Sequence, residues 1–204
     1  MTAGLMRRLA AIATLIALAA CAGTPVRSMQ SDADTPPMLV LVVRHGEKAP
    51  TPPNDPVLSE AGMARAAALD STLRRLAVTD VVVSQLQRTR LTASIFLART
   101  NAMVHVVPIG AAGVAAHVQA VADTVRAIAR TAGRGGVLVV GHSNTVTSIV
   151  DALGGGASPA LCDSQYSQLF TLREQASGLV STTRTTYGKS DPVDATCAAL
   201  SGPR

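Results

Sequence analysis

The chain has very few aromatic residues. Among its 204 residues there are two Phe and two Tyr, and Trp is absent. A hydrophobic core must therefore be built from aliphatic side chains, which the 48% hydrophobic content supplies for one domain. Charged residues are also scarce, at 15%, and the formal net charge is only +5. No basic cluster with interleaved aromatic residues occurs, so we expect no nucleic-acid partner.

Other chemical patterns are missing or incomplete. The four histidines and three cysteines show no His-x-x-x-His or Cys-x-x-Cys spacing, so we predict no metal site and no cofactor. Gly133–Gly136 precedes an apolar run, whereas a phosphate-binding P-loop follows a strand and contains a lysine. Ser143 lacks the second glycine of the Gly-x-Ser-x-Gly nucleophile elbow.

The first 37 residues differ in character from the rest. Residues 1–20 hold two arginines and then the apolar run Leu9–Ala20, as in a secretory signal peptide, and this run is short for a bilayer span. The end of the run, Leu18–Cys21 (LAAC), resembles the lipobox of bacterial lipoproteins, whose cysteine is acylated and becomes the mature N-terminus. The resemblance implies a lipoprotein signal peptide and lipidation of Cys21. An ordinary signal peptide with an incidental cysteine is the alternative.

The same resemblance predicts a location. Ala22, rather than Asp, follows the cysteine, which in a host with two membranes implies the outer membrane. We therefore expect a protein of the bacterial cell envelope that faces the periplasm and is attached to the membrane through its N-terminal lipid. Residues 21–37 are rich in Gly, Thr, Pro, Ser and Asp, which is typical of a flexible tether. The folded domain is predicted over 38–190 and a C-terminal tail over 191–204.

Within residues 38–190, apolar runs of strand length alternate with helical patterns. We predict strands over 38–44, 79–84, 103–107, 136–141, 169–173 and 179–186. Helices are predicted after Ser59, over Ala93–Arg99 and Ala115–Thr131, and from Val146 to the glycines at 154–156. The proline-rich stretch Lys48–Val57 is predicted to form a loop over the end of the first strand. This alternation predicts an α/β fold, with a mostly parallel central sheet, helices on both faces, and antiparallel edge strands near the C-terminus.

Polar side chains follow three of these strands where each strand ends. The segments are RHGE at 44–47, SQLQRTRLT at 84–92 and GHSNT at 141–145. Because the carboxyl ends of parallel strands share one edge of a sheet, we expect their side chains to gather there. Arginine guanidinium groups match phosphoryl oxygens bidentately, and a neutral imidazole can attack phosphorus to form phosphohistidine. The pattern therefore predicts a phosphate pocket with a reactive histidine.

Taken in this order, the three motifs resemble the histidine phosphatase superfamily, also called phosphoglycerate-mutase-like, over roughly residues 39–187. The resemblance implies a three-layer sandwich and a phosphatase that hydrolyses a phosphomonoester or phosphoramidate of a small molecule through a phosphohistidine intermediate. By position, His45 resembles the nucleophile, and Arg44, Arg88 and His142 resemble the rest of the phosphate pocket. The further substrate-binding candidates beside these motifs are Glu47, Ser84 and Asn144.

One part of the family pattern is missing. Members that use a general acid usually place Glu or Asp after the second-strand arginine, but Val104–Ala122 contains no carboxylate. His117 lies in this region, and we interpret it as a candidate proton donor, because histidine suits acid–base work near neutral pH. The alternative is a helix histidine without a catalytic role. The gap leaves open a second function, a phosphate-ligand-binding lipoprotein with little or no turnover.

Two cysteines remain once Cys21 is acylated. Cys162 and Cys197 can pair outside the cytoplasm, and two unpaired thiols are the alternative, because the sequence does not show their distance. The short segments between strands leave little material for a lid, which favours an open phosphatase site over a mutase. The sequence predicts no particular substrate and no oligomeric state.

Overall fold

The computed structural model describes residues 38–131, 135–175, 177–194 and 197. The predicted signal peptide at 1–20, the tether at 21–37 and the acylated Cys21 lie outside the described residues, as does most of the tail beyond 194. None of the helices within the described ranges is long and apolar enough to cross a membrane.

Strands from both ends of the domain form one sheet. They are β1 (Leu39–Arg44), β2 (Val78–Val83), β3 (Met103–Val106), β4 (Gly136–Gly141), β5 (Gln168–Glu174) and β6 (Val180–Thr186). Their order is β3-β2-β4-β1-β5-β6, in which β1 to β4 are parallel and β5 is antiparallel to both its neighbours. The predicted mostly parallel sheet with antiparallel strands near the C-terminus is confirmed.

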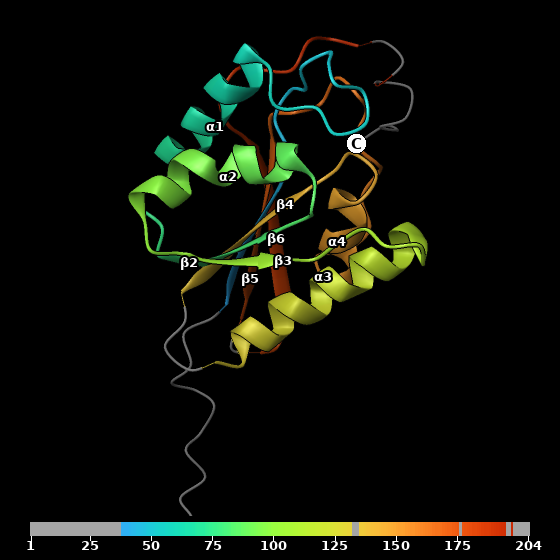
Figure 1. Ribbon diagram of the computed structural model, residues 1–204. Coiled ribbons are helices and arrows are strands. Elements are labelled where there is room, and N and C mark those ends of the chain that lie inside the picture. Colours follow the sequence, from blue (N-terminus) through green and yellow to red (C-terminus); the bar gives the residue numbers. More distant parts are fainter. Residues whose placement is uncertain (1–37, 132–134, 176, 195–196, 198–204) are drawn as a thin grey trace, which may run out of the picture. The chain divides into compact units, whose positions relative to one another are not determined.

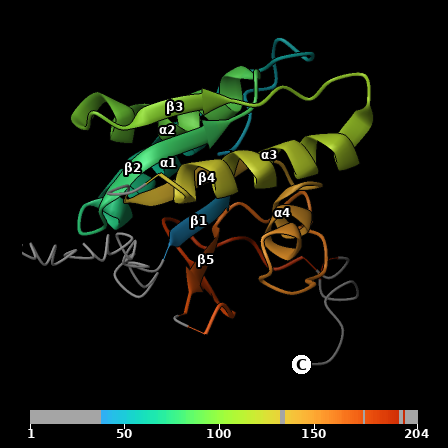
Figure 2. The ribbon, with the colours of Figure 1, turned by 90° about the horizontal axis from the view of Figure 1, so that it is seen from below.

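Helices cover both faces of the sheet (Figures 1 and 2). The helices are α1 (Glu60–Leu73), α2 (Gln87–Arg99), α3 (Gly113–Ala129) and α4 (Val146–Ala152). Alternate side chains of β1 point to opposite faces, so Val40 and Val42 pack with α3 and α4, while Leu41 and Val43 pack with α1 and α2. Val, Leu, Ile and Ala dominate both core layers, as the scarcity of aromatic residues predicts.

Helix α2 begins at Gln87, well before the predicted start at Ala93. The sequence QRTRLT has no apolar periodicity, but Thr89 and Thr92 occupy the buried positions of this first part of the helix. Their hydroxyls donate to the carbonyls of Leu86 (2.9 Å) and Arg88 (2.7 Å), which satisfies polar groups inside the core. Apolar spacing does not predict this part of the helix, because its buried positions are threonines.

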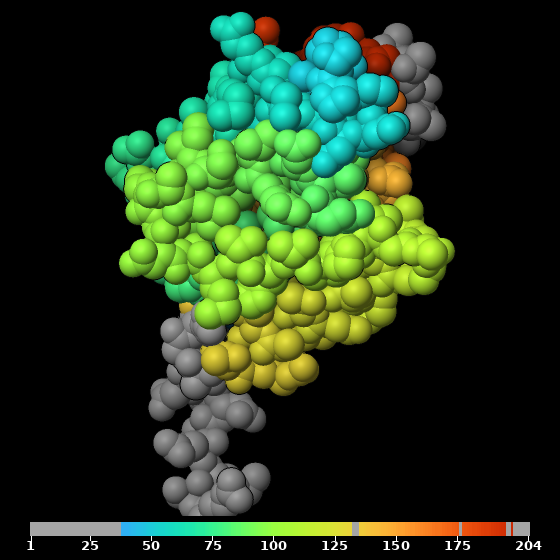
Figure 3. All heavy atoms as spheres, viewed as in Figure 1, coloured from blue at the N-terminus to red at the C-terminus, as the bar shows by residue number. Residues whose placement is uncertain are grey.

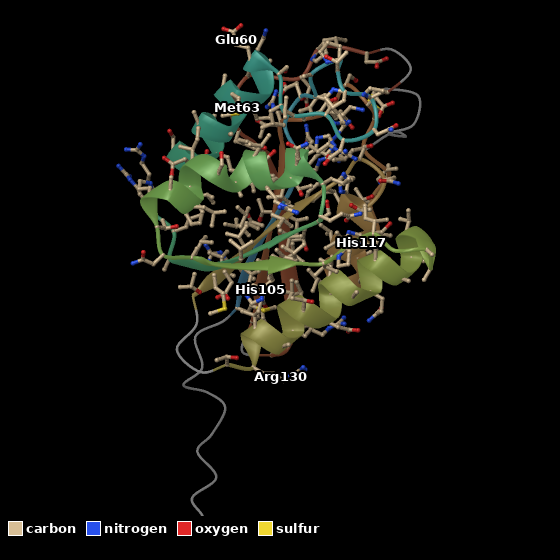
Figure 4. All side chains as sticks on the ribbon, viewed as in Figure 1. Glu60, Met63, His105, His117 and Arg130 are labelled. Atoms are coloured by element: carbon tan, nitrogen blue, oxygen red, sulfur yellow. A yellow bond between two sulfur atoms is a disulfide. The ribbon has the colours of Figure 1, made fainter. Side chains whose placement is uncertain are left out.

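The start of α1 packs directly on the turn that follows β1. Ser59 caps the helix as predicted, accepting from the backbone N–H of Gly62 at 3.2 Å. Met63 is 39% exposed on α1 (Figure 4), whereas Gly62 is buried. A Cβ atom at Gly62 would lie 2.3 Å from the Glu47 carbonyl oxygen, so only glycine permits this close approach.

The proline-rich loop at 48–57 lies against the start of α2 (Figure 3, blue beside green). The loop closes through an Ala49 N–H to Val57 carbonyl hydrogen bond of 2.9 Å. At its far side, the Asp55 carboxylate accepts from the backbone N–H of Gln87 at 2.9 Å, as an acidic group at a helix start commonly does. The loop thereby brings Asp55 close to Arg88.

After β6 the chain returns to the domain as a segment that we call the C-terminal strap, residues 187–194 with Cys197. The carboxylate of Asp191 accepts hydrogen bonds from the segment 166–168. Cys197 forms a disulfide with Cys162, so the alternative of two unpaired thiols does not hold. Contacts of the domain therefore extend past the predicted boundary at residue 190.

Candidate active site

The pairing of β1 with β4 brings two histidines together. Arg44 lies opposite Gly141 in the register, and the backbone N–H of His45 donates to the Gly141 carbonyl at 3.0 Å. His142 follows Gly141 directly, so its ring centroid lies 5.2 Å from that of His45. Both histidines and Arg44 are buried, with at most 4% of each residue exposed.

His45 presents a neutral ring with one unprotonated nitrogen. Its Nδ1 lies 2.8 Å from the Gly46 carbonyl oxygen, which can only accept, so Nδ1 carries the proton and Nε2 keeps its lone pair. Burial lowers the pKa of His45 to about 3, and the charges of His142, Arg44 and Arg88 act in the same direction. A neutral imidazole with a fixed tautomer is the form that can act as a nucleophile.

Gly46 permits the close packing that holds this turn. A Cβ atom at Gly46 would lie 2.9 Å from the Gly62 carbonyl oxygen of α1, closer than real side chains approach. Its backbone N–H donates to the Thr92 hydroxyl of α2 at 2.9 Å. The turn after β1 is therefore fixed by both helices of this face.

His142 is bound on one ring nitrogen and open on the other. Its Nε2 lies 3.1 Å from the Ser84 hydroxyl, while its Nδ1 is buried and has no partner among the described residues. When the Ser84 hydroxyl donates to Nε2, the proton of the neutral ring is on Nδ1, and Nδ1 is then a hydrogen-bond donor. Burial, followed by the charge of Arg88, lowers the pKa of His142 to about 3. The Thr145 hydroxyl accepts from the His142 backbone N–H at 2.9 Å and fixes the turn.

Arg44 and Arg88 complete the group. Nη1 of Arg44 donates to three carbonyls of the segment 162–165, at 2.8 to 3.0 Å, but its Nε is buried without a partner in the described part of the chain. The same holds for Nε of Arg88, whose Nη1 lies 3.9 Å from an Asp55 carboxylate oxygen. Burial lowers the pKa of both guanidinium groups, yet arginine keeps its charge at neutral pH.

Three buried nitrogens near His45 therefore lack partners within the described residues: Nε of Arg44, Nε of Arg88 and Nδ1 of His142. A buried donor without an acceptor costs about 1–3 kcal/mol, so such a group points to a ligand that supplies acceptors. A phosphoryl group carries several oxygens and negative charge, which suits two guanidinium groups and one imidazole N–H. These three nitrogens thus have the chemistry that a phosphoryl oxyanion requires.

The three candidate substrate-binding residues, Glu47, Ser84 and Asn144, differ in their contacts. Glu47 turns to Arg65, with its carboxylate 2.6 Å from Nη2 and 3.0 Å from Nε. Ser84 reaches the site through His142, as described above. Asn144 is exposed beside the turn, and no hydrogen bond of its side chain occurs with the described residues.

His117 lies near the start of α3 and is 4% exposed (Figure 4). Its Nδ1 donates to the Pro108 carbonyl at 3.3 Å, which leaves Nε2 without the proton of a neutral ring. Burial lowers the pKa of His117, so its ring is neutral near pH 7. This neutral state suits accepting a proton better than donating one. The proton-donor role stays a prediction.

The remaining histidine lies apart from this group. His105 on β3 bonds to the buried Asp80 carboxylate at 2.8 Å, beside a hollow of about 230 Å³ against the second half of α3 (Figure 4). Over residues 38–131, 135–175, 177–194 and 197, no three His, Cys, Asp or Glu side chains come together to hold a metal ion.

Tyr166 is a neighbour of the site that the sequence pattern did not reveal. Its ring lies 3.9 Å from the Arg44 guanidinium carbon and 6.2 Å, between centroids, from the His45 ring. Tyr166 precedes β5 and is distant in sequence from all three motifs, so no spacing rule could select it. The scarcity of aromatic residues was the one available signal, because Tyr166 is one of only two tyrosines.

We expect His45 and His142 to stay neutral in the folded chain as the pH is lowered from 7 to about 4. An unfolded histidine binds its proton near pH 6.5, whereas these two do so only near pH 3, so the free energy of unfolding should fall as the pH drops through this window. Nitrogen NMR of the histidine rings and urea unfolding at several pH values measure both effects. Protonation of both rings near pH 6.5 in the folded chain would contradict this assignment.

Part of the chain resembles a known protein family in sequence. Residues 40–110 match the family model of the histidine phosphatase superfamily (branch 1). A comparison with curated proteins found no match.

Solved structures share the fold. The protein histidine phosphatase SixA complexed with tungstate is 22% identical, with a TM-score of 0.54 over 73% of this chain and 97% of that one. A mycobacterial glucosyl-3-phosphoglycerate phosphatase in complex with VO3 is 17% identical, with a TM-score of 0.55 over 75% of this chain and 100% of that one. Mycobacterial hydrolase 1 is 16% identical, with a TM-score of 0.52 over 76% and 99%. The chain thus has a histidine-phosphatase-like fold.

Proposed function

We propose that this chain is a phosphatase that works through a phosphohistidine on His45, and the match of residues 40–110 to the family model of the histidine phosphatase superfamily (branch 1) supports this. Its substrate is a phosphomonoester or a phosphoramidate. The observation that carries the proposal is the set of three buried, unpartnered nitrogens of Arg44, Arg88 and His142, found among the described residues around a neutral His45. Two structures of the same fold are named as complexes with tungstate and VO3, which are oxyanions, and this supports an oxyanion at the site.

In the first step, Nε2 of His45 attacks phosphorus in line. The bond between phosphorus and the leaving group breaks, and the phosphoryl group is transferred to Nε2. Arg44, Arg88 and His142 stabilise the charge on the equatorial oxygens, and they are held in place before the reaction begins. The Gly46 carbonyl, which accepts from Nδ1, stabilises the positive charge that develops on the imidazole ring. In the second step, water attacks the phosphohistidine, phosphate is released and Nε2 regains its lone pair.

The leaving group decides how much acid assistance the first step needs. An aryl phosphate expels a stable anion, and a phosphoramidate nitrogen is protonated readily, so both tolerate a weak acid. We propose His117 as the group that protonates poor leaving groups: a proton first taken up at its free Nε2 passes to the leaving-group oxygen as the bond to phosphorus breaks.

Replacing His117 with alanine should therefore slow alkyl phosphates by about tenfold or more, and para-nitrophenyl phosphate by much less. Steady-state phosphate release from both substrates measures this ratio. An equal loss for the two substrates would remove His117 from the mechanism.

A second function has one observation in its favour. Val104–Ala122 contains no carboxylate, and His117 is buried and neutral. This combination suits a lipoprotein that binds a phosphate ligand with little or no turnover. The two functions separate in one experiment, in which the purified full chain is incubated with a panel of aryl phosphates, alkyl phosphates and phosphoramidates. Release of phosphate above a His45→Ala blank supports the enzyme, and orthophosphate binding without release from any substrate supports the binding protein.

We propose further that the protein is attached to the bacterial outer membrane and faces the periplasm. Acylated Cys21 would be the anchor, and residues 21–37 would be the flexible tether to the folded domain. The lipobox-like sequence Leu18–Cys21 supports this, and the disulfide between Cys162 and Cys197 suits a compartment outside the cytoplasm. A Cys21→Ser variant should leave the membrane fraction or stay unprocessed, as detected by fractionation and mass spectrometry. Unchanged attachment of the variant would contradict acylation.

A further inference from the structure

Arg44 has only one edge of its guanidinium group available for a ligand. Nη1 is taken up by the carbonyls of Cys162, Asp163 and Gln165. The remaining edge consists of Nε, which is buried and unpartnered in the described part of the chain, and Nη2, one N–H of which points the same way as the Nε–H. Nη2 lies 3.6 Å from the carboxylate of Asp163, a side chain that is 99% exposed. Arg44 therefore offers a bidentate fork to a phosphoryl group only while the segment 162–165 stays in place.

Tyr166 fixes the plane of the same group. Its ring lies 3.9 Å from the guanidinium carbon, so it covers one face of the planar cation. The three carbonyls prevent translation of Arg44 and the ring prevents rotation out of the plane. Both come from one short segment that connects α4 with β5.

This segment is itself held by the C-terminal strap, and mainly by Asp191. One carboxylate oxygen of Asp191 accepts from the backbone N–H groups of Tyr166 (2.7 Å) and Ser167 (2.8 Å). The other accepts from the Ser167 hydroxyl at 2.7 Å and the Gln168 amide at 3.0 Å. Burial alone would raise the pKa of Asp191, but these hydrogen bonds lower it below its usual range, so it is ionised.

The strap is anchored at both sides of Asp191. Before it, Nη1 of Arg65 donates to the carbonyls of Tyr187 (3.2 Å) and Lys189 (3.1 Å). After it, the Ser164 hydroxyl donates to Asp194 at 3.0 Å, and Cys197 is joined to Cys162. Asp191 is thus held from α1 by Arg65 on one side, and on the other side by two bonds that tie the strap to the segment 162–165.

We propose that Asp191 is a positioning residue for phosphate binding, which acts through Tyr166 and the segment 162–165 to hold the Nε–Nη2 edge of Arg44 toward the phosphoryl group. The proposal rests on the function proposed above for the same site. It assigns to the strap, which lies outside the three sequence motifs, a role in binding the phosphoryl group.

The test measures orthophosphate affinity by calorimetry and kcat/KM for para-nitrophenyl phosphate, on the purified full chain. Asp191→Asn keeps the size of the side chain but loses its charge and turns an amide toward the Ser167 and Gln168 donors. We expect both quantities to fall by about 10- to 100-fold, as a small misplacement of a binding group does. In an Arg44→Lys background, which has no fork to position, the same substitution should change them by no more than about twofold.

Asp70→Asn is the matched control. Asp70 is a buried carboxylate near the end of α1 that binds Arg99 at 2.7 Å and Arg74 at 3.3 Å, away from the site. Its replacement should lower the melting temperature without changing orthophosphate affinity. A loss of affinity by Asp191→Asn that is equal in the wild-type and Arg44→Lys backgrounds would overturn the proposal, because the carboxylate would then act independently of Arg44.

A second pair of variants tests the same role if Asp191→Asn does not fold. Tyr166→Leu removes the ring over Arg44 and should weaken orthophosphate binding, and Tyr166→Phe, which keeps the ring, should recover most of the loss. Equal losses in both variants would assign the effect to the hydroxyl and overturn the positioning role. If the wild-type chain binds orthophosphate but hydrolyses no substrate, the proposed phosphatase function fails, while the binding measurements still decide the role of Asp191.

Discussion

Replacing His45 with alanine should lower kcat/KM for para-nitrophenyl phosphate by about 10³-fold or more, because it removes the nucleophile that we propose for the phosphoenzyme. We expect no substitution by His142, since its Nε2 is bound to Ser84 and its Nδ1 is assigned to phosphate binding in our proposal. Acid quenching of the wild-type chain during turnover, followed by phosphorus NMR or mass spectrometry, should detect an acid-labile phosphoryl group that the variant lacks.

Orthophosphate binding should respond differently to the same change. Arg44, Arg88 and His142 remain in the variant, so we expect affinity to change by about tenfold at most, and this separates loss of chemistry from loss of the pocket. His105→Gln serves as the control histidine, because His105 bonds to Asp80 away from these residues. A His45→Ala chain that still forms a phosphoenzyme would show that another residue is the nucleophile.

Replacing Glu47 with alanine should lower the free energy of unfolding by about 3–5 kcal/mol, since it leaves a buried guanidinium group without its counter-charge. The Arg65 side chain is only 3% exposed, and its Nε and Nη2 both bind the Glu47 carboxylate. Nη1 of the same arginine donates to the carbonyls of Tyr187 and Lys189 without involving Glu47, so the strap should keep these hydrogen bonds in the variant. Urea unfolding followed by circular dichroism measures this change.

The control for Glu47 is Glu60, a carboxylate that is exposed to solvent. Glu60→Ala, in the first turn of α1, should cost no more than about 1 kcal/mol. Kinetics distinguish the two roles of Glu47: a substrate contact predicts a raised KM at unchanged stability, whereas the ion pair predicts lower stability and a KM within about twofold of wild type. Glu47→Leu combined with Arg65→Met should recover part of the lost stability, because no unpaired charge then remains buried.

The sequence by itself determined the fold class and the edge of the sheet at which the candidate residues meet. Buried strands of Val and Leu alternate with helices, and this alternation leads to parallel strands whose carboxyl ends share one edge. Arg44 is the last residue of such a strand, and His45 and His142 directly follow one, so their proximity required no knowledge of the loops. Arg88 was found by its motif, even though the helix that carries it begins earlier than its apolar pattern indicates.

The tertiary structure decided what each of these residues binds. The contact of Tyr166 with Arg44, the pairing of Cys162 with Cys197 and the bonds of Asp191 join segments that lie far apart in the chain. No local periodicity encodes such contacts, because they depend on how the connection before β5 and the strap after β6 pack against the end of β1. The same reason explains Glu47, whose place in the RHGE motif suggested a ligand contact, while packing of α1 on the turn directed it to Arg65.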